Sequence, residues 1–156
     1  MLDDVETVRW SAEVQPTGNT DGAVPRALRG LAEATTATGE AALSRLLFAV
    51  GNDHCGSYRP VVLAVVPFLG EILRDGGDTA RARTLDALVD LTGSFGPEPG
   101  FEHVTTPDGE GLVKELLREK VLALVPEIER CRITAATLEE VALATYLLEQ
   151  LALEPW

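Results

Sequence analysis

Strand-forming residues are scarce in this chain of 156 residues: isoleucine occurs three times, and aromatic side chains make up only 5% of the sequence. Leucine and alanine, which favour helices, occur 23 and 19 times instead. This bias predicts an all-α protein. The length suits one globular domain with an ordinary hydrophobic core.

Basic residues are also in short supply, with 13 against 25 acidic residues and a net charge of −12. A protein that binds nucleic acid needs a basic face that displaces counterions from phosphates, so nucleic acid is not the expected partner. A negative field attracts basic proteins and repels anionic membranes. The charge therefore favours a basic protein partner.

Long apolar runs and export signals are missing as well. The longest apolar run, residues 61–69, contains Pro67 and is too short to cross a bilayer. Residues 1–6 lack the basic and apolar regions of a signal peptide. Cys55 and Cys131, 76 residues apart, are expected to be reduced thiols. We therefore expect a cytoplasmic protein without membrane contact.

Apolar residues at helical spacing begin after residue 20. Residues 1–20 contain Trp10 and several turn formers, which predicts an N-terminal arm anchored by Trp10. Residues 21–156 are expected to be a single helical domain, with Ser57 as the N-cap of its third helix. The expected helices cover residues 21–33, 39–50, 57–74, 78–93 and 109–131, and a sixth runs from Thr134 or Thr137 to about Leu153. Residues 92–108, with three prolines and three glycines, form the one long loop.

An internal repeat indicates how these helices are arranged. Val-Pro pairs occur at Val24-Pro25, Val66-Pro67 and Val125-Pro126, and their prolines are 42 and 59 residues apart. Removing the loop of 17 residues from the second spacing gives 42 again, within the period of HEAT-type repeats. We therefore predict a short HEAT-like α-α superhelix of about three helical hairpins; the alternative is an irregular bundle. Six leucines are expected in its core: Leu46, Leu63, Leu69, Leu88, Leu122 and Leu147.

The N-terminal half of the chain also carries a family resemblance. It rests on Trp10, on residues 23–28, on Gly51-Asn52 and on residues 54–58 and 64–69. This pattern is similar to that of an uncharacterised bacterial family of HEAT-like repeat proteins, of the PBS-lyase/HEAT type, over most of residues 9–95. The spacing from Gly-Asn to His is shorter here than in the family. The resemblance implies the α-solenoid fold and a role as an immunity or adaptor protein, without an established enzymatic activity.

Four residues are candidates for contacting a partner. Tyr58 and Arg59 form an aromatic and cationic pair of the kind that anchors interfaces. Phe101 and His103 lie in the long loop, and long loops in compact domains are often functional. The structural alternatives are that Tyr58 covers the second helix, that Arg59 is solvated, and that the loop residues pin the loop to the domain.

Acidic residues near the C-terminus are candidates for electrostatic capture of a partner. Residues 98–156 contain twelve acidic and five basic residues. Glu139 and Glu140, together with Glu115, Glu119 and Glu149, are expected to attract a basic partner. The alternative is an ordinary solvated helix face.

Asp53, His54 and Cys55 place an acid, an imidazole and a thiol side by side. Adjacent residues in a turn usually point apart, and zinc needs three or four ligands at spacings that this sequence lacks. We therefore expect no catalytic residue, no metal and no cofactor. The expected function is a non-catalytic protein-binding module that captures a basic partner. The alternatives are a self-associating structural protein and an enzyme with its site in residues 51–59.

Overall fold

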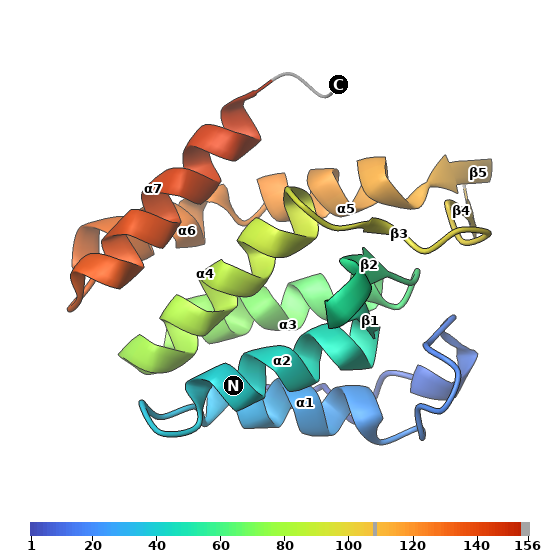
Figure 1. Cartoon of the computed structure of the whole chain (residues 1–156), viewed down its shortest axis with the longest axis horizontal. Coiled ribbons are helices and arrows are strands. Elements are labelled where there is room, and N and C mark those ends of the chain that lie inside the picture. The colour runs from blue at the N-terminus through green and yellow to red at the C-terminus, as the bar shows by residue number, and fades with distance from the viewer. Residues whose placement is uncertain (108, 154–156) are drawn as a thin grey trace.

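The computed structural model describes residues 1–107 and 109–153, and most of these residues lie in helices (Figure 1). The helices are α1 (Ala23–Ala32), α2 (Gly39–Val50), α3 (Val62–Asp75), α4 (Asp78–Thr92), α5 (Val113–Leu122), α6 (Val125–Thr134) and α7 (Leu138–Ala152). The short elements between them are η1 (Trp10–Ala12), β1 (Gly51–Asn52), η2 (Asp53–Cys55), β2 (Ser57–Tyr58), β3 (Gly96–Pro97), β4 (His103–Thr106) and β5 (Gly109–Leu112). The chain is therefore predominantly helical, as predicted, with a few short strands. Within the described residues, no helix combines the length and the apolar character needed to span a membrane.

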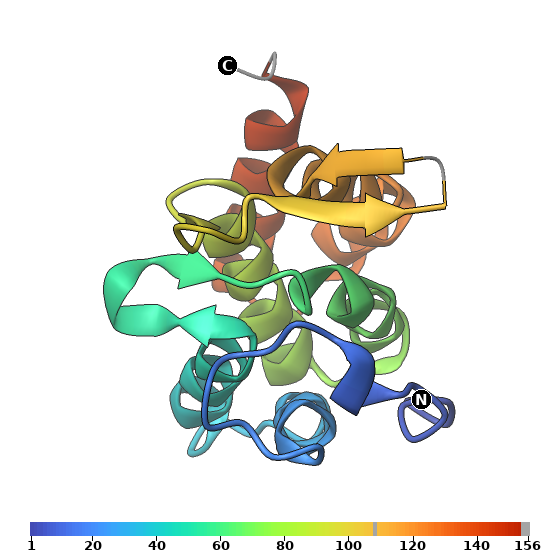
Figure 2. The same cartoon turned by 90° about the vertical axis from the view of Figure 1, so that its right-hand side faces the viewer.

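The helices form two layers. One layer contains α1, α3 and the pair α5 and α6, with α3 in contact with the other three. The second layer contains α2, α4 and α7, with α4 in the middle. Across the layers, α1 packs on α2, α3 on α4, and α6 on α7. Figure 1 shows α1 and α2 at one end, here called the N-terminal end, and α5 to α7 at the other, called the C-terminal end; Figure 2 looks nearly along α1 and α2.

Apolar side chains at helical spacing fill the space between the layers. Four of the leucines predicted for the core are fully buried: Leu46, Leu69, Leu88 and Leu147. Leu63 is partly buried and packs against the same core. Leu122 is 42% exposed, so its predicted burial is wrong.

A break in the predicted helix over residues 109–131 explains the exposure of Leu122. Residues 109–112 form β5, which pairs with β4; α5 then ends at Leu122, and α6 begins at Val125. A proline inside a helix removes a backbone donor and collides with the carbonyl four residues earlier, which for Pro126 is that of Leu122. Leu122 therefore lies at a helix end, outside the buried stripe. Pro67, in contrast, lies within the continuous α3.

The third helix begins later than predicted, at Val62 instead of near Ser57. Ser57 and Tyr58 form β2, which pairs antiparallel with β1 and parallel with β3. Gly51 allows this close pairing, because a Cβ there would overlap the carbonyl of Ser57 and lie 2.5 Å from the Cα of Tyr58. The predicted role of Ser57 as a helix cap is therefore wrong.

Residues 1–20 lie along α3 and against the turn before it, with contacts as far as Phe68 and Glu71. Trp10 is buried, its indole Nε1 donates to the carbonyl of Val5 at 2.7 Å, and its ring centroid lies 5.9 Å from that of Phe68. The backbone amide of Val61 donates to the carbonyl of Val14 at 3.2 Å. Buried side-chain and backbone contacts thus both hold this segment in place.

Candidate functional site

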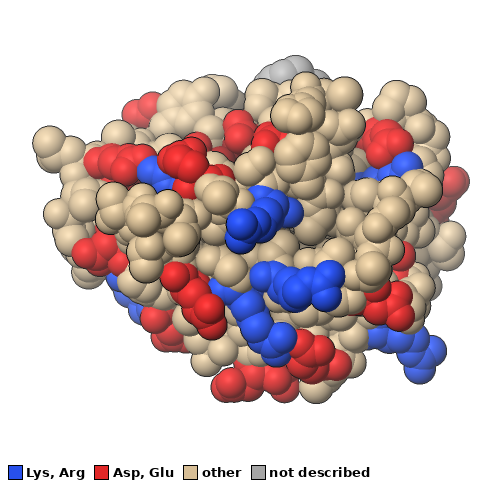
Figure 3. Space-filling view, turned by 60° about the horizontal axis from the view of Figure 1, so that its bottom comes forward, with Lys and Arg blue, Asp and Glu red and all other residues tan. Residues whose placement is uncertain are grey.

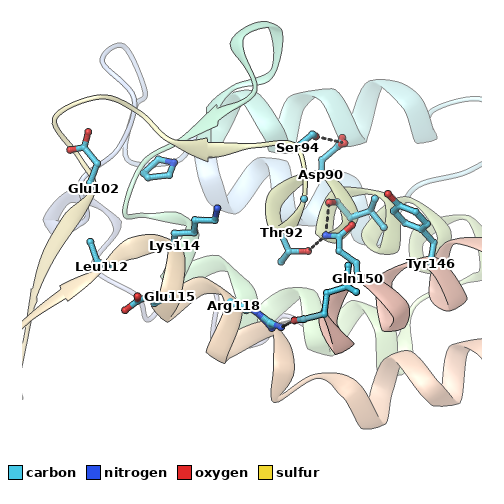
Figure 4. A pocket seen from close by; sticks show the side chains of 14 residues that line it. Asp90, Thr92, Ser94, Glu102, Leu112, Lys114, Glu115, Arg118, Tyr146 and Gln150 are labelled. Carbon is cyan, nitrogen blue, oxygen red and sulfur yellow. Dashed lines mark hydrogen bonds between the residues drawn. The ribbon is translucent and has the colours of Figure 1, made fainter. Parts of the chain in front are cut away.

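An open groove of about 860 Å³ lies at the C-terminal end of the molecule (Figure 4). Its walls come from the end of α4, the start of α5, the second half of α7 and residues around β3. We call it the C-terminal groove. Because its walls are distant in sequence, the groove exists only in the folded chain.

Exposed apolar side chains line the C-terminal groove. The exposed fraction is 56% for Tyr146, 39% for Leu112 and 61% for Leu153. Figure 4 shows Tyr146 on α7 and Leu112 at the end of β5, on opposite sides of the groove. Covering such side chains is favourable by about 25 cal/mol per Å² of apolar surface. The groove therefore offers separate apolar contact points to a bound segment.

Charged residues are interspersed with this apolar surface: Asp90, Glu102, Glu115, Lys114 and Arg118. Both carboxylate oxygens of Glu102 accept the backbone N–H of Gly100, at 3.0 and 3.1 Å. Hydrogen bonds from the backbone of Glu102 itself and from that of Gly100 lower the pKa of the Glu102 carboxyl group and keep it negative. Burial, followed by the nearby charge of Asp86, raises the pKa of Asp90.

Two polar side chains fix the walls of the groove. Arg118 of α5 donates to the carbonyls of Leu151 and Leu153 at the end of α7, at 2.6 and 2.5 Å. A cation suits this position because the carbonyl end of a helix is partially negative. Gln150 of α7 donates to the hydroxyl of Thr92 on α4 at 2.7 Å. The charge of Arg118 is thus engaged by α7, and the groove holds three carboxylates, Asp90, Glu102 and Glu115, beside the second cation, Lys114.

Tyr58 and Arg59 lie in different environments. Tyr58 is fully buried, because β2 is paired on both sides and its ring becomes part of the core. Its predicted role as an accessible partner contact is therefore wrong. Arg59 does meet Phe101: the guanidinium carbon lies 4.2 Å from the ring centroid.

Glu98 completes this cluster in the long loop. Nε and Nη2 of Arg59 each donate to a carboxylate oxygen of Glu98 at 2.8 Å. This bidentate bond lowers the pKa of Glu98. The cluster holds residues 98–101 against β2, which is the structural alternative for Phe101. Arg59 is 15% exposed and bonded to Glu98, so the alternative of a solvated Arg59 is wrong. His103 lies at the exposed start of β4, where its Cα is paired with that of Leu112 beside the C-terminal groove.

Glu139 and Glu140 lie in the first turn of α7 and contact α4. Glu140 is fully buried, and its Oε1 accepts the Nε of Arg81 at 2.6 Å. Its predicted place on an exposed acidic surface is therefore wrong. Arg83 pairs with Glu139 and, at 2.7 Å, with Glu40 of α2. These pairs join α2, α4 and α7. The charge of Glu140 is compensated inside the fold, whereas the Glu139 side chain is 56% exposed and stays on the surface, as predicted.

Asp53, His54 and Cys55 have different surroundings, although they are adjacent in η2. A carboxylate oxygen of Asp53 accepts the hydroxyl of Ser44 at 2.9 Å, and the His54 ring packs edge-on against Phe48 at 4.9 Å. The thiol of Cys55 is free and exposed. In residues 1–107 and 109–153, no group of three or more His, Cys, Asp or Glu side chains is placed to hold a metal ion.

Comparisons with protein-family models, curated proteins and solved structures found no match to this chain.

Proposed function

We propose that this protein is a non-catalytic protein-binding module, of the immunity or adaptor type, that captures a basic partner in the C-terminal groove. The proposed architecture is a short HEAT-like superhelix of about three helical hairpins. The two helical layers support it, because α1 with α2, α3 with α4, and α6 with α7 stack as successive pairs. The break between α5 and α6 then divides the first helix of the last hairpin. The proposed compartment is the cytoplasm, where the free thiols of Cys55 and Cys131 stay reduced.

One observation carries the proposed binding function. In the C-terminal groove, exposed Tyr146, Leu112 and Leu153 stand beside Glu102 and Glu115. Large apolar side chains flanked by charge are typical of interface hot spots, where an aromatic anchor supplies much of the affinity. A partner segment with apolar and basic side chains is complementary to both features. The negative net charge of the chain steers such a partner toward the surface.

Replacing Tyr146 with alanine is expected to weaken partner binding by roughly tenfold or more, because it removes the aromatic anchor. The test is affinity capture from the native host with the wild-type chain as bait, followed by measurement of Kd for the purified partner. Leu138→Ala is the matched control, since Leu138 is also an exposed apolar residue of α7 but does not line the groove. Equal affinity for the two variants would place the interface elsewhere.

The unpaired carboxylates near the groove are expected to govern the association rate. Glu115, Glu119 and Glu149 are exposed on α5 and α7, and no ion pair is described for them within residues 1–107 and 109–153. Replacing all three with glutamine should slow association and flatten its salt dependence, while the dissociation rate changes little. Each change should alter folding stability by only about 0 to 1 kcal/mol. Stopped-flow association with the captured partner at several salt concentrations measures the effect, and an unchanged rate would contradict electrostatic capture.

A further inference from the structure

The N-terminal end carries a second groove, and its charge is opposite to that of the whole chain. This hollow of about 700 Å³ lies between α1 and α2, and we call it the N-terminal groove. Small residues form much of its lining: Ala23, Ala27, Gly30 and Ala49. Three arginines line it as well, Arg26 and Arg29 from α1 and Arg45 from α2, against a single acidic residue, Glu33.

Two of these arginines have no carboxylate partner among the residues that the structure describes. Arg26 donates to the hydroxyl of Thr20 at 2.9 Å, and no bond is described for the Arg45 side chain within residues 1–107 and 109–153. Arg29 does pair with Glu6. Seven other arginines are engaged by carboxylates or by backbone carbonyls: Arg59, Arg74, Arg81, Arg83, Arg118, Arg130 and Arg132. For Arg9, outside the groove, no such contact is described in the same part of the chain. Although the chain has 25 acidic residues, the N-terminal groove thus brings together two arginines that no carboxylate of the described residues neutralises.

The surroundings of the N-terminal groove limit the size of an anionic ligand. Figure 3 shows basic side chains gathered near the middle of this face, with acidic side chains around them. A long polyanion such as nucleic acid would have to cross the acidic margin and would be repelled by the net charge of −12. A short anionic segment reaches the arginines without crossing that margin.

An aromatic side chain at the same groove adds an apolar contact. Phe48 is 37% exposed and lies on α2 one turn after Arg45. Its ring is supported by His54, whose ring centroid lies 4.9 Å away in an edge-on arrangement. Arginine forks match carboxylates in geometry, and an exposed aromatic ring matches an apolar side chain.

We infer that the N-terminal groove binds an acidic peptide segment of a partner protein. Carboxylates of the segment pair with Arg26 and Arg45, and an apolar side chain of the segment packs on Phe48. This site lies at the opposite end of the molecule from the C-terminal groove, so it is independent of the function proposed there.

A labelled-peptide binding experiment tests this inference. The probe is a dye-labelled peptide of Glu and Asp residues around a central Leu-Phe pair, and its control carries Gln and Asn in place of the acids. Fluorescence anisotropy with the full chain should show tighter binding of the acidic peptide, weakening as salt is added. Arg45→Glu should reduce this affinity by roughly tenfold or more, and Arg45→Gln by a smaller factor. Lys120→Glu is the matched control, because Lys120 is exposed on α5 and the change in charge is the same.

Every other outcome overturns the inference. The inference is wrong if the acidic peptide binds no more tightly than the control peptide with Gln and Asn. It is also wrong if Arg45→Glu and Lys120→Glu reduce the affinity for the acidic peptide equally. Light scattering that shows self-association of the wild-type chain, abolished by Arg45→Glu, would assign the face to a second copy instead. Binding of a single-stranded oligonucleotide that depends on Arg45 would assign it to nucleic acid.

Discussion

Replacing Arg81 with leucine is expected to lower the free energy of unfolding by about 3 to 5 kcal/mol, because Glu140 then remains buried without its cation. Glu140 is fully buried, whereas the Arg81 side chain is 18% exposed. Nε of Arg81 lies 2.6 Å from Oε1 of Glu140, and Nη2 lies 3.4 Å from Oε2. The pair joins α4 to the first turn of α7, so its loss weakens the attachment of the last helix. Urea unfolding followed by circular dichroism measures the change.

Two further variants distinguish the cost of leaving a buried charge unpaired from the contribution of an ion pair to stability. Arg132 is 42% exposed and pairs with Glu129 within α6, so Arg132→Leu should cost only about 0 to 1 kcal/mol. The double variant Arg81→Leu with Glu140→Leu should recover much of the lost stability, because apolar groups replace both charges. If Arg81→Leu costs no more than Arg132→Leu, the desolvated carboxylate of Glu140 does not determine the stability of this contact.

Helices whose local signals agree were predicted well. The expected helix over residues 39–50 has the observed bounds of α2, because its apolar stripe ends where Gly51 stops it. The helix expected over residues 78–93 differs from α4 by one residue at its end. In both cases the apolar period, the helix formers and the terminal glycine point to the same segment.

Contacts between distant residues could not be predicted in the same way. Arg81 and Glu140 are 59 positions apart, and the sequence around Glu140 resembles that around the exposed Glu149. Likewise, β2 depends on pairing with β3, so Ser57 was indistinguishable from a helix cap. The C-terminal groove combines four segments of the chain, and two of them hold residues predicted as candidates or near candidates: the start of α5 with Glu115 and the long loop with Glu102. Tyr146, the aromatic side chain of the groove, was missed.

Two substitutions of Tyr58 should change the folding stability of the chain in different directions. Its side chain is fully buried, and its hydroxyl has no hydrogen-bond partner among the residues that the structure describes. Tyr58→Ala removes a large core side chain and should cost about 3 to 5 kcal/mol. Tyr58→Phe removes only the hydroxyl, and an unpaired buried polar group costs about 1 to 3 kcal/mol, so this variant should be at least as stable as the wild type. A clear loss of stability in Tyr58→Phe would mean that the hydroxyl does have a partner.

The same side chain should make folding stability sensitive to alkaline pH. Burial raises the pKa of Tyr58 from 10.0 to about 12, because the phenolate is poorly solvated in the core. The unfolded chain therefore loses this proton at lower pH than the folded chain. The contribution of Tyr58 to stability is constant below about pH 10 and falls as the pH rises toward 12, by roughly 2 kcal/mol over that interval. Tyr58→Phe has no such proton, so its stability relative to the wild type should grow across this range. Unfolding curves measured for both chains between pH 8 and about pH 12 test the sign, and parallel stability profiles would show that the phenol ionises equally easily in both states.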